Sequence, residues 1–202
     1  MQKPVEILAA VEGTVDEVVV RRLAYEAGLP VAVVHGKRGK DDLRQRLPGY
    51  NTAARFGVWV VLVDLDHDAD CAPELVADWL PAPSRGMCFR VVVRAMEAWL
   101  LADRERLAAF LGVAPGRIPP DPELEPDPKR TMVGLSIQSR RREIREDMAP
   151  RWESGRVVGP AYTSRMIEFT QSHWRPEQAA ERSDSLRRCL RRLRELEHQA
   201  RS

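Results

Sequence analysis

The segment at positions 57–63 constrains the fold more strongly than any other part of this 202-residue chain. Its sequence, GVWVVLV, is almost wholly apolar and rich in β-branched residues, which is typical of a strand buried on both faces of a parallel sheet. Shorter apolar runs at 5–11, 31–34 and 88–93 predict three more strands. Such a sheet needs helices on both of its faces, so we expect an α/β fold.

Helical patterns separate and follow the predicted strands. Three helices are predicted between strands, over 15–27, 41–55 and 72–80, and two more follow the last strand, over 96–101 and 104–111. Strand and helix therefore alternate along the first half, which indicates a mostly parallel sheet flanked by helices.

The second half of the chain has a different character. Residues 112–128 contain six prolines and few large apolar side chains, so we expect a loop or an exposed arm there. Beyond this loop the sequence predicts three helices, over 130–148, 164–174 and 184–199. The expected organisation is an α/β core over 1–111 and a basic helical extension over 129–202 that packs on the core.

Composition excludes several classes of protein. No apolar run approaches the roughly 18 residues that a membrane span needs. The first residues, MQKPVEILAAVEG, have too short an apolar stretch and the wrong flanks for a signal peptide, so we expect a cytoplasmic protein. Cys71, Cys88 and Cys189 are too few and too widely spaced for a disulfide framework or a zinc cluster. Cys189 falls on the apolar face of the last helix and is expected in the core.

The formal net charge of +2 conceals an uneven distribution. Residues 1–127 carry 15 basic and 20 acidic side chains, whereas residues 128–202 carry 17 and 10. Arginines on the helices of the second part could contact phosphates and give sequence-independent affinity for nucleic acid. The candidates are Arg140, Arg141, Arg145, Arg188 and Arg192. Because glutamates are interleaved with them, a solvated helix face is the alternative interpretation.

An acidic run follows the most apolar strand directly. Asp64, Asp66, Asp68 and Asp70 alternate with other residues in the sequence DLDHDAD. In open α/β sheets the carboxyl ends of the strands are where ligands bind, and closely spaced carboxylates attract cations. Hard oxygen ligands of this kind suit Mg²⁺ or Mn²⁺. The alternative is an acidic turn that only ends the strand and caps the next helix.

Other interpretations of these loops can be compared by spacing. An EF-hand would need glycine and glutamate where the chain has Ala69 and Leu75, so we reject it. A haloacid-dehalogenase-type phosphatase would have threonine or valine where the chain has Asp68, which weakens this alternative but leaves it open. The sequence GKRGK at 36–40 resembles a phosphate-binding loop only superficially, because its glycines are too close and Asp41 replaces the hydroxyl.

Two further carboxylates come after predicted strands. Glu12 ends the first strand, and Asp16 follows four residues later. A capping box over 14–17 would account for Glu17, but it would not account for Glu12. Glu97 comes soon after the valine-rich strand. Together with the acidic run, these residues lie at the carboxyl ends of three strands, and such an acidic cluster can hold two divalent ions that stabilise attacking and leaving oxygens.

The chain resembles a Toprim (topoisomerase–primase) domain. That family has Glu-Gly after its first strand and Asp-x-Asp after a later one, matched here by Glu12-Gly13 and Asp64-Leu65-Asp66. The Toprim nucleases of the overcoming-lysogenisation-defect (OLD) type add two acids and a later lysine. The matching residues are Asp16, Glu97 and Lys129. The sequence at 94–103 and the helical tail after Asp-Pro-Lys also resemble a small stand-alone Toprim-like family that is often paired with an ATPase in phage defence.

The resemblance implies a nuclease that uses Mg²⁺ or Mn²⁺ and a Toprim-like fold. Glu12 would act in acid–base or metal chemistry, and Lys129 would stabilise developing charge on the phosphate. The principal ion would be held by Asp64 and Asp66, and a second ion by Asp16 and Glu97. The implied partners are DNA or RNA, including tRNA, and an ATPase.

One residue departs from the OLD-type pattern. Ala95 stands where those sites have serine, so a hydroxyl is missing beside the second ion. Two other functions remain as alternatives. A phosphatase of haloacid-dehalogenase type would not need Glu12, and a non-catalytic Toprim module would bind a partner or nucleic acid with acids that are only structural.

Overall fold

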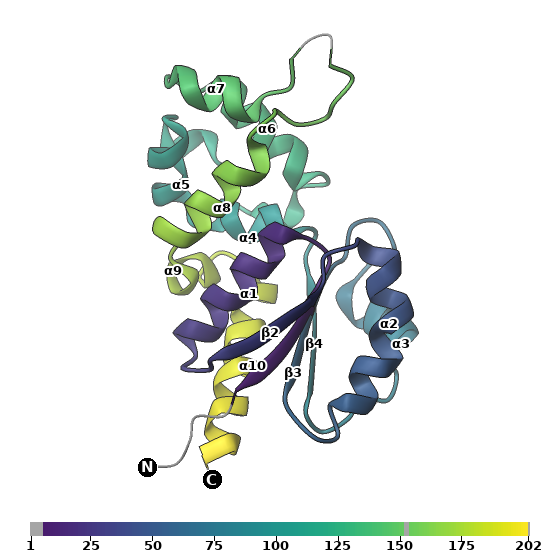
Figure 1. Cartoon of the computed structure of the whole chain (residues 1–202). Helices are drawn as coiled ribbons and strands as arrows, with labels where there is room; N and C mark the ends of the chain where they lie inside the picture. Colours follow the sequence, from purple (N-terminus) through teal and green to yellow (C-terminus); the bar gives the residue numbers. More distant parts are fainter. Residues whose placement is uncertain (1–5, 152–153, 202) are drawn as a thin grey trace. The chain divides into compact units, whose positions relative to one another are not determined.

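The computed structural model describes residues 6–151 and 154–201, and the chain divides into two compact units (Figure 1). The sheet unit consists of Met1–Val93 with Ser185–Ser202, and the helical unit of Arg94–Asp184. The expected core boundary near residue 111 therefore differs from the observed division at Val93. The reason is that the first helices after the sheet pack with later helices, and the last helix joins the sheet unit.

The sheet unit contains four strands that are all parallel, in the order β2-β1-β3-β4. They are β1 (Ile7–Val11), β2 (Val31–Gly36), β3 (Trp59–Asp64) and β4 (Met87–Val92). The first five residues of β3 are buried, as its apolar sequence predicts for a strand covered on both faces. The structure confirms the α/β fold class and all four predicted strands. Because the strands are parallel, they end at one side of the sheet, here called the carboxyl edge.

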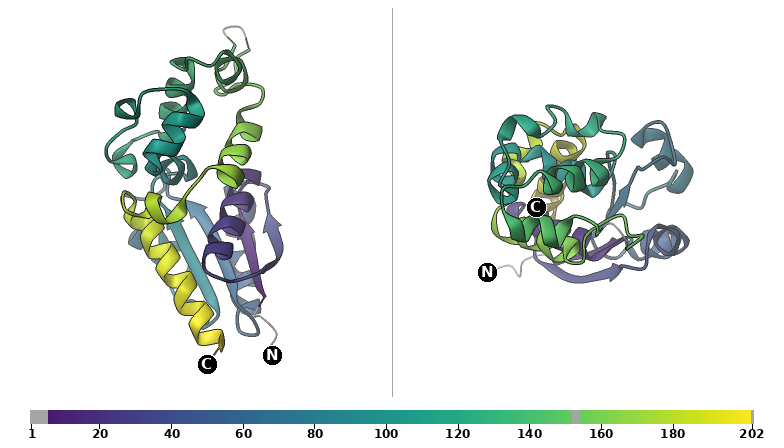
Figure 2. Two further views of the ribbon diagram at one scale, coloured as in Figure 1. Left: turned by 90° about the vertical axis from the view of Figure 1, so that its left-hand side faces the viewer. Right: turned by 90° about the horizontal axis from the view of Figure 1, so that it is seen from above.

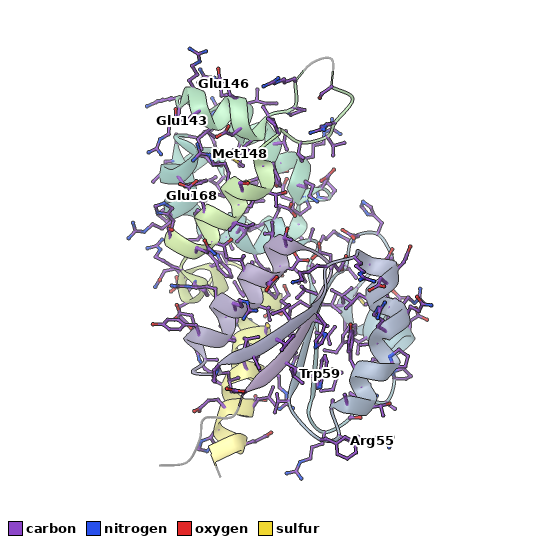
Figure 3. All side chains as sticks on the ribbon, viewed as in Figure 1. Arg55, Trp59, Glu143, Glu146, Met148 and Glu168 are labelled. Atoms are coloured by element: carbon purple, nitrogen blue, oxygen red, sulfur yellow. The ribbon has the colours of Figure 1, made fainter. Side chains whose placement is uncertain are left out.

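Two helices cover one face of the sheet, α2 (Lys40–Ala53) and α3 (Ala72–Trp79) (Figure 1). Leu43 and Leu47 of α2 and Leu75 of α3 pack into one cluster with alternate residues of β3 and β4. Trp59, labelled in Figure 3, begins β3 and stacks on Tyr50 of α2. This face is held by apolar contacts from side chains that alternate along the strands.

The other face is covered by α1 (Thr14–Glu26) and α10 (Asp184–Arg201), and Figure 2 shows α10 running along the strands. The buried residues of α10 recur every three or four positions, as an amphipathic helix on a core requires. They are Leu186, Cys189, Leu190, Leu193 and Leu196. Cys189 is fully buried, which confirms its expected place in the core.

The helical unit contains six α-helices in the part of it that the structure describes. They are α4 (Met96–Ala102), α5 (Arg104–Leu111), α6 (Pro128–Ile137), α7 (Arg142–Met148), α8 (Tyr162–Ser172) and α9 (Pro176–Ala180). Every residue of α4 is buried, and Trp174 donates its indole N–H to the Trp99 carbonyl. Figure 3 shows Glu143 and Glu146 on α7, where both are exposed, while Met148 is buried. Helix α4 thus lies inside the helical unit, whereas α7 packs one side inward.

One segment of the helical unit differs from expectation, and another agrees with it. The single helix predicted over 130–148 is wrong, because Ser139 interrupts it between α6 and α7. The Ser139 hydroxyl donates to the Leu111 carbonyl and accepts from the Arg141 N–H. The proline-rich segment is a loop that carries two short 3-10 helices, Pro115–Arg117 and Pro122–Leu124, and it is anchored because Ile118 is almost fully buried.

The length and hydropathy of the helices show whether any of them could span a membrane. Within residues 6–151 and 154–201, none is both long enough and apolar enough to cross a membrane.

Candidate functional site

Glu12 and Asp64 meet at the carboxyl edge of the sheet. Strands β1 and β3 are neighbours in parallel register, with Ala10 opposite Val61, so the residues that follow them come close together. The Glu12 Oε1 accepts a hydrogen bond of 2.7 Å from the Asp64 backbone N–H. Sequence spacing predicted that these two residues share an edge, and the structure brings them into direct contact.

The environment of Glu12 disfavours its ionised form. Burial of the side chain, with smaller contributions from the charges of Asp16 and Asp66, raises the pKa of Glu12 to about 7 from an ordinary 4.5. The N–H of Asp64 and the ammonium of Lys40 act in the opposite direction, because both stabilise negative charge. A carboxyl group with a pKa near 7 can both accept and release a proton at neutral pH.

The acidic loop after β3 is fixed by the residue between its first two aspartates. Leu65 is almost fully buried in the cluster beneath α2 and α3, and its N–H donates to the Val92 carbonyl at 2.9 Å. Asp66 then turns with a φ of 48°, in the left-handed region that Asp tolerates better than most residues. The carboxylate of Asp66 is about half exposed. The chain therefore places Asp66 at the surface of the carboxyl edge.

Asp16 has a structural role as well as an electrostatic one. Its Oδ2 accepts a hydrogen bond of 2.8 Å from the Gly13 N–H and so caps the start of α1. The prediction that Glu17 serves the capping box was wrong. Glu17 is paired instead with Lys37 at 2.8 Å and Arg21 at 3.0 Å. Asp16 nevertheless stays close enough to Glu12 to raise the pKa of that carboxyl.

The loop at residues 36–40 is part of the site, and sequence reasoning missed it. The Lys37 N–H donates to the Val11 carbonyl at 2.8 Å, and the Gly39 N–H donates to the Glu12 carbonyl at 3.0 Å. The Lys40 ammonium lies 2.8 Å from Asp66 and 2.6 Å from Asp68. The signal was the sequence GKRGK, which failed as a phosphate-loop motif but does supply cations to the carboxyl edge.

Gly36 allows this loop to approach the end of β1. Its φ is +84°, and a Cβ at this position would collide with the carbonyl oxygen of Val11. Among the described residues, Lys37 and Asp66 are the non-glycine residues with positive φ. Both lie at the carboxyl edge, and unusual backbone conformations of this kind are concentrated at functional sites.

Beside the acidic loop lies a hollow of about 420 Å³ with an acidic lining. Its carboxylates come from the end of the loop and from α3, and they are Asp68, Asp70, Glu74 and Asp78. The phosphates of a nucleic acid would be repelled by this lining. The side of the carboxyl edge formed by the basic loop at 36–40 is the more favourable approach for a polyanion.

Glu97 and Lys129, the other two proposed catalytic or metal residues, lie in the helical unit. The Glu97 side chain is largely buried in the first turn of α4, and its Oε1 accepts a hydrogen bond of 3.1 Å from the Tyr162 hydroxyl. The Lys129 ammonium lies 3.6 Å from the same oxygen. Burial and the adjacent Glu97 carboxylate both raise the pKa of Tyr162, so its hydroxyl stays protonated and remains a donor. Ala95 is the N-cap of α4.

The predicted residues thus fall into two groups. Glu12, Asp16, Asp64 and Asp66 belong to the sheet unit, and Glu97 and Lys129 belong to the helical unit. Tyr162 was missed because it lies 65 positions from Glu97 and no local motif marks it.

The five candidate arginines have different surroundings. Arg141 and Arg145 donate to the carbonyl oxygens of Phe110 and Ser139, which favours a structural role between helices. Arg192 is mostly buried and lies 3.3 Å from Glu195. Arg140 and Arg188 have exposed side chains, so they remain the better candidates for contacts with phosphate.

The uneven charge distribution does not follow the compact units. The sheet unit carries 17 basic and 15 acidic residues, and the helical unit carries 15 of each. The acidic first part and basic second part of the sequence are therefore not separate bodies, because the arginine-rich α10 belongs to the sheet unit.

The carboxyl edge has carboxylate oxygens of the kind that bind divalent ions, but they are not arranged as a complete set of ligands. Across residues 6–151 and 154–201, no three His, Cys, Asp or Glu side chains are grouped so that they could hold a metal ion as they stand. The donors at this edge are hard carboxylate oxygens, which suit Mg²⁺ or Mn²⁺. The ammonium of Lys40 already occupies a cation position between Asp66 and Asp68. The residues present therefore fit a divalent ion, provided that some side chains turn.

Comparison of the chain with protein-family models, with curated proteins and with solved structures found no match.

Proposed function

We propose that this chain is a Toprim-like nuclease that uses Mg²⁺ or Mn²⁺ to cleave nucleic-acid phosphodiester bonds. The observation that carries the proposal is the environment of Glu12. This carboxyl accepts a hydrogen bond from the Asp64 N–H at the carboxyl edge and lies near Asp16 and Asp66. Its pKa is raised to about 7. A raised carboxyl pKa among other carboxylates is typical of catalytic sites, and both a proton and a metal ion would relieve the repulsion.

The sheet unit supplies the proposed acid–base chemistry and the principal ion site. Asp64 and Asp66 would hold the principal ion, and Asp16, at the start of α1, would support a second ion. Glu12 would take the proton from an attacking water at its carboxylate and release it again, since its pKa matches neutral pH. A bound Mg²⁺ or Mn²⁺ would supply positive charge that polarises the phosphoryl oxygens.

The helical unit supplies the remaining proposed roles. Glu97 would serve as a carboxylate ligand for an ion, and the Tyr162 hydroxyl would hold its carboxylate in one orientation. The Lys129 side chain is about half exposed, so its ammonium can reach a substrate phosphate and stabilise developing charge there.

The proposed substrate is DNA or RNA, including tRNA, and the proposed partner is an ATPase in phage defence, acting in the cytoplasm. Exposed Arg140 and Arg188 would add phosphate contacts whose contribution falls as salt rises. The basic loop at 36–40 offers the ammonium groups of Lys37 and Lys40 near the carboxyl edge.

The test is a cleavage assay with purified protein, Mg²⁺ or Mn²⁺, and labelled DNA, RNA and tRNA. We expect Glu12→Ala and Asp66→Ala each to lower the cleavage rate by at least about 100-fold, because each removes a group that acts on the reaction. Glu17→Ala is the matched control, since Glu17 lies in the first turn of α1, five residues after Glu12, but pairs with Lys37 and Arg21. Cleavage that survives in both variants would contradict the mechanism. Hydrolysis of a phosphomonoester that survives Glu12→Ala would favour the phosphatase alternative.

A further inference from the structure

Lys40 lies among the carboxylates of the carboxyl edge although it is the first residue of a helix. Its ammonium is 2.8 Å from Asp66 Oδ2 and 2.6 Å from Asp68 Oδ2. The lysine side chain is 18% exposed, whereas the two aspartates are 48% and 46% exposed. The positive charge also acts on Glu12 and lowers the pKa of that carboxyl. Lys40 is therefore the inner member of this group, and the aspartates are its outer members.

The ammonium stays charged in this position. Burial by itself would lower the pKa of Lys40, but hydrogen bonds to Asp66 and Asp68 and the charge of Glu12 raise it above the ordinary value. A lysine ammonium is a compact charge on a flexible stem, so it can leave the aspartates without movement of the helix. It therefore resembles a small cation that is tethered beside the site.

Lys37 in the same loop provides a contrast. Its ammonium pairs with Glu17 at 2.8 Å, and its backbone N–H is bound to the Val11 carbonyl. Glu17 is not one of the carboxylates proposed to hold the ion. The two lysines are three residues apart, yet only Lys40 is paired with a carboxylate of the proposed ion site.

We propose that Lys40 is the resident counterion of this site, which a divalent ion has to displace in order to bind Asp66. The inference rests on the proposed function, since it concerns the same carboxylates. Lys40 is then a positioning residue. It holds the acidic loop in place before an ion binds, and it sets the ion concentration at which the site fills.

The test is a titration with Mn²⁺, followed by the electron paramagnetic resonance signal of the free ion. We expect Lys40→Met to bind Mn²⁺ about ten-fold more tightly than the unchanged chain, because two ion pairs no longer compete. Lys40→Gln, which keeps a hydrogen-bond donor without charge, should show the same gain. Lys40→Arg should restore the weaker binding, since it keeps the charge, and Lys37→Met is the matched control. Thermal unfolding without divalent ions checks that each variant folds.

The outcomes separate the two proposals. If Asp66→Asn abolishes Mn²⁺ binding but Lys40→Met and Lys40→Gln bind as the unchanged chain does, the counterion role is wrong and the proposed function stands. Equal gains in Lys40→Met and Lys37→Met would also overturn the inference, because a general charge effect would then suffice. If neither the unchanged chain nor Lys40→Met binds Mn²⁺ at millimolar concentration, the proposed ion site and this inference are both wrong.

Discussion

Glu12 in the sheet unit and Glu97 in the helical unit are both withdrawn from solvent, but their partners differ. Glu12 accepts one backbone N–H and is surrounded by the charges of Asp16, Asp66 and Lys40. Glu97 accepts the Tyr162 hydroxyl and lies 3.6 Å from the Lys129 ammonium. The first environment disfavours an ionised carboxyl, and the second offers a hydroxyl donor and a nearby ammonium.

This difference separates a reactive carboxyl from a positioned one. A group whose charged form is unfavourable gains by taking up a proton or a cation, and the raised pKa of Glu12 reports that tendency. A carboxylate such as Glu97, which already has a hydroxyl donor and a nearby ammonium, gains less from a further cation. Hence we expect the proton transfer at Glu12, and we expect Glu97 to contribute mainly through its fixed orientation.

Gly36→Ala should have the strongest effect on stability, because it displaces the loop that brings Lys40 beside Glu12 and Asp66. A Cβ at residue 36 would collide with the Val11 carbonyl oxygen, and the φ of +84° is itself unfavourable for alanine. We expect the free energy of unfolding to fall by on the order of 4 kcal/mol, measured by urea denaturation.

Gly28→Ala is the control for the collision. Gly28 also has a positive φ, of +73°, but its nearest neighbour to a Cβ, on Glu197, is at an ordinary 3.9 Å. Its loss should be about 1 kcal/mol, the cost of the backbone conformation alone. Equal losses in the two variants would show that the close approach of the loop to β1 contributes nothing.

The stability of Glu12→Gln relative to the original chain should depend on pH, because the pKa of Glu12 is raised in the folded state. The pKa of Glu12 is about 7 in the folded chain and near 4.5 when unfolded, so the folded state binds the proton more tightly. The folded chain therefore loses stability from Glu12 as pH rises from about 4.5 to 7. We expect Glu12→Gln to be the more stable chain at pH 8, by up to about 3 kcal/mol, and nearly equal to the original below pH 5. Urea denaturation across this range measures the difference.

Glu17→Gln is the control with the opposite sign. Hydrogen bonding to Lys37 lowers the pKa of Glu17, with a smaller contribution from Arg21. Its carboxylate therefore stabilises the fold above the unfolded pKa, and this stabilisation is lost as pH falls through the folded pKa. Glu17→Gln should be less stable than the original chain at pH 8. If Glu12→Gln and the original chain differ in free energy of unfolding by the same amount at pH 5 and pH 8, the pKa of Glu12 is not raised.

The sequence predicted the parts of this site that follow from strand alternation. Parallel strands end at one edge, so residues just after β1 and β3 had to be neighbours, and Glu12 does contact Asp64. The position of Lys40 could not be predicted in the same way. It depends on Gly36, whose backbone conformation brings the loop against Val11, and a short basic sequence does not specify that conformation.

The division of the chain into its two compact units could not be predicted either, because it too depends on contacts between distant parts of the sequence. The apolar face of α10 was predicted from the spacing of Leu186, Cys189 and Leu193, but periodicity does not say which surface covers such a face. The structure places α10 on the sheet unit, so a boundary drawn by composition at residue 111 differs from the compact units. Likewise, the contact of Tyr162 with Glu97 joins two helices that no local pattern connects.

The smallest expected effect tests what holds Glu97. Tyr162→Phe removes a donor from the carboxylate of a side chain that is only 11% exposed, so we expect a loss of about 2 kcal/mol in the free energy of unfolding. Lys129→Met should cost less than about 1 kcal/mol, because that side chain is 54% exposed and its ion pair is long, at 3.6 Å. Urea denaturation at pH 7 measures both, and Tyr25→Phe, at a tyrosine that is 76% exposed, controls for loss of a hydroxyl. If Lys129→Met costs more than Tyr162→Phe, the lysine is the main partner of Glu97. Lys129 would then be committed to Glu97, and it would not be available to bind a phosphate.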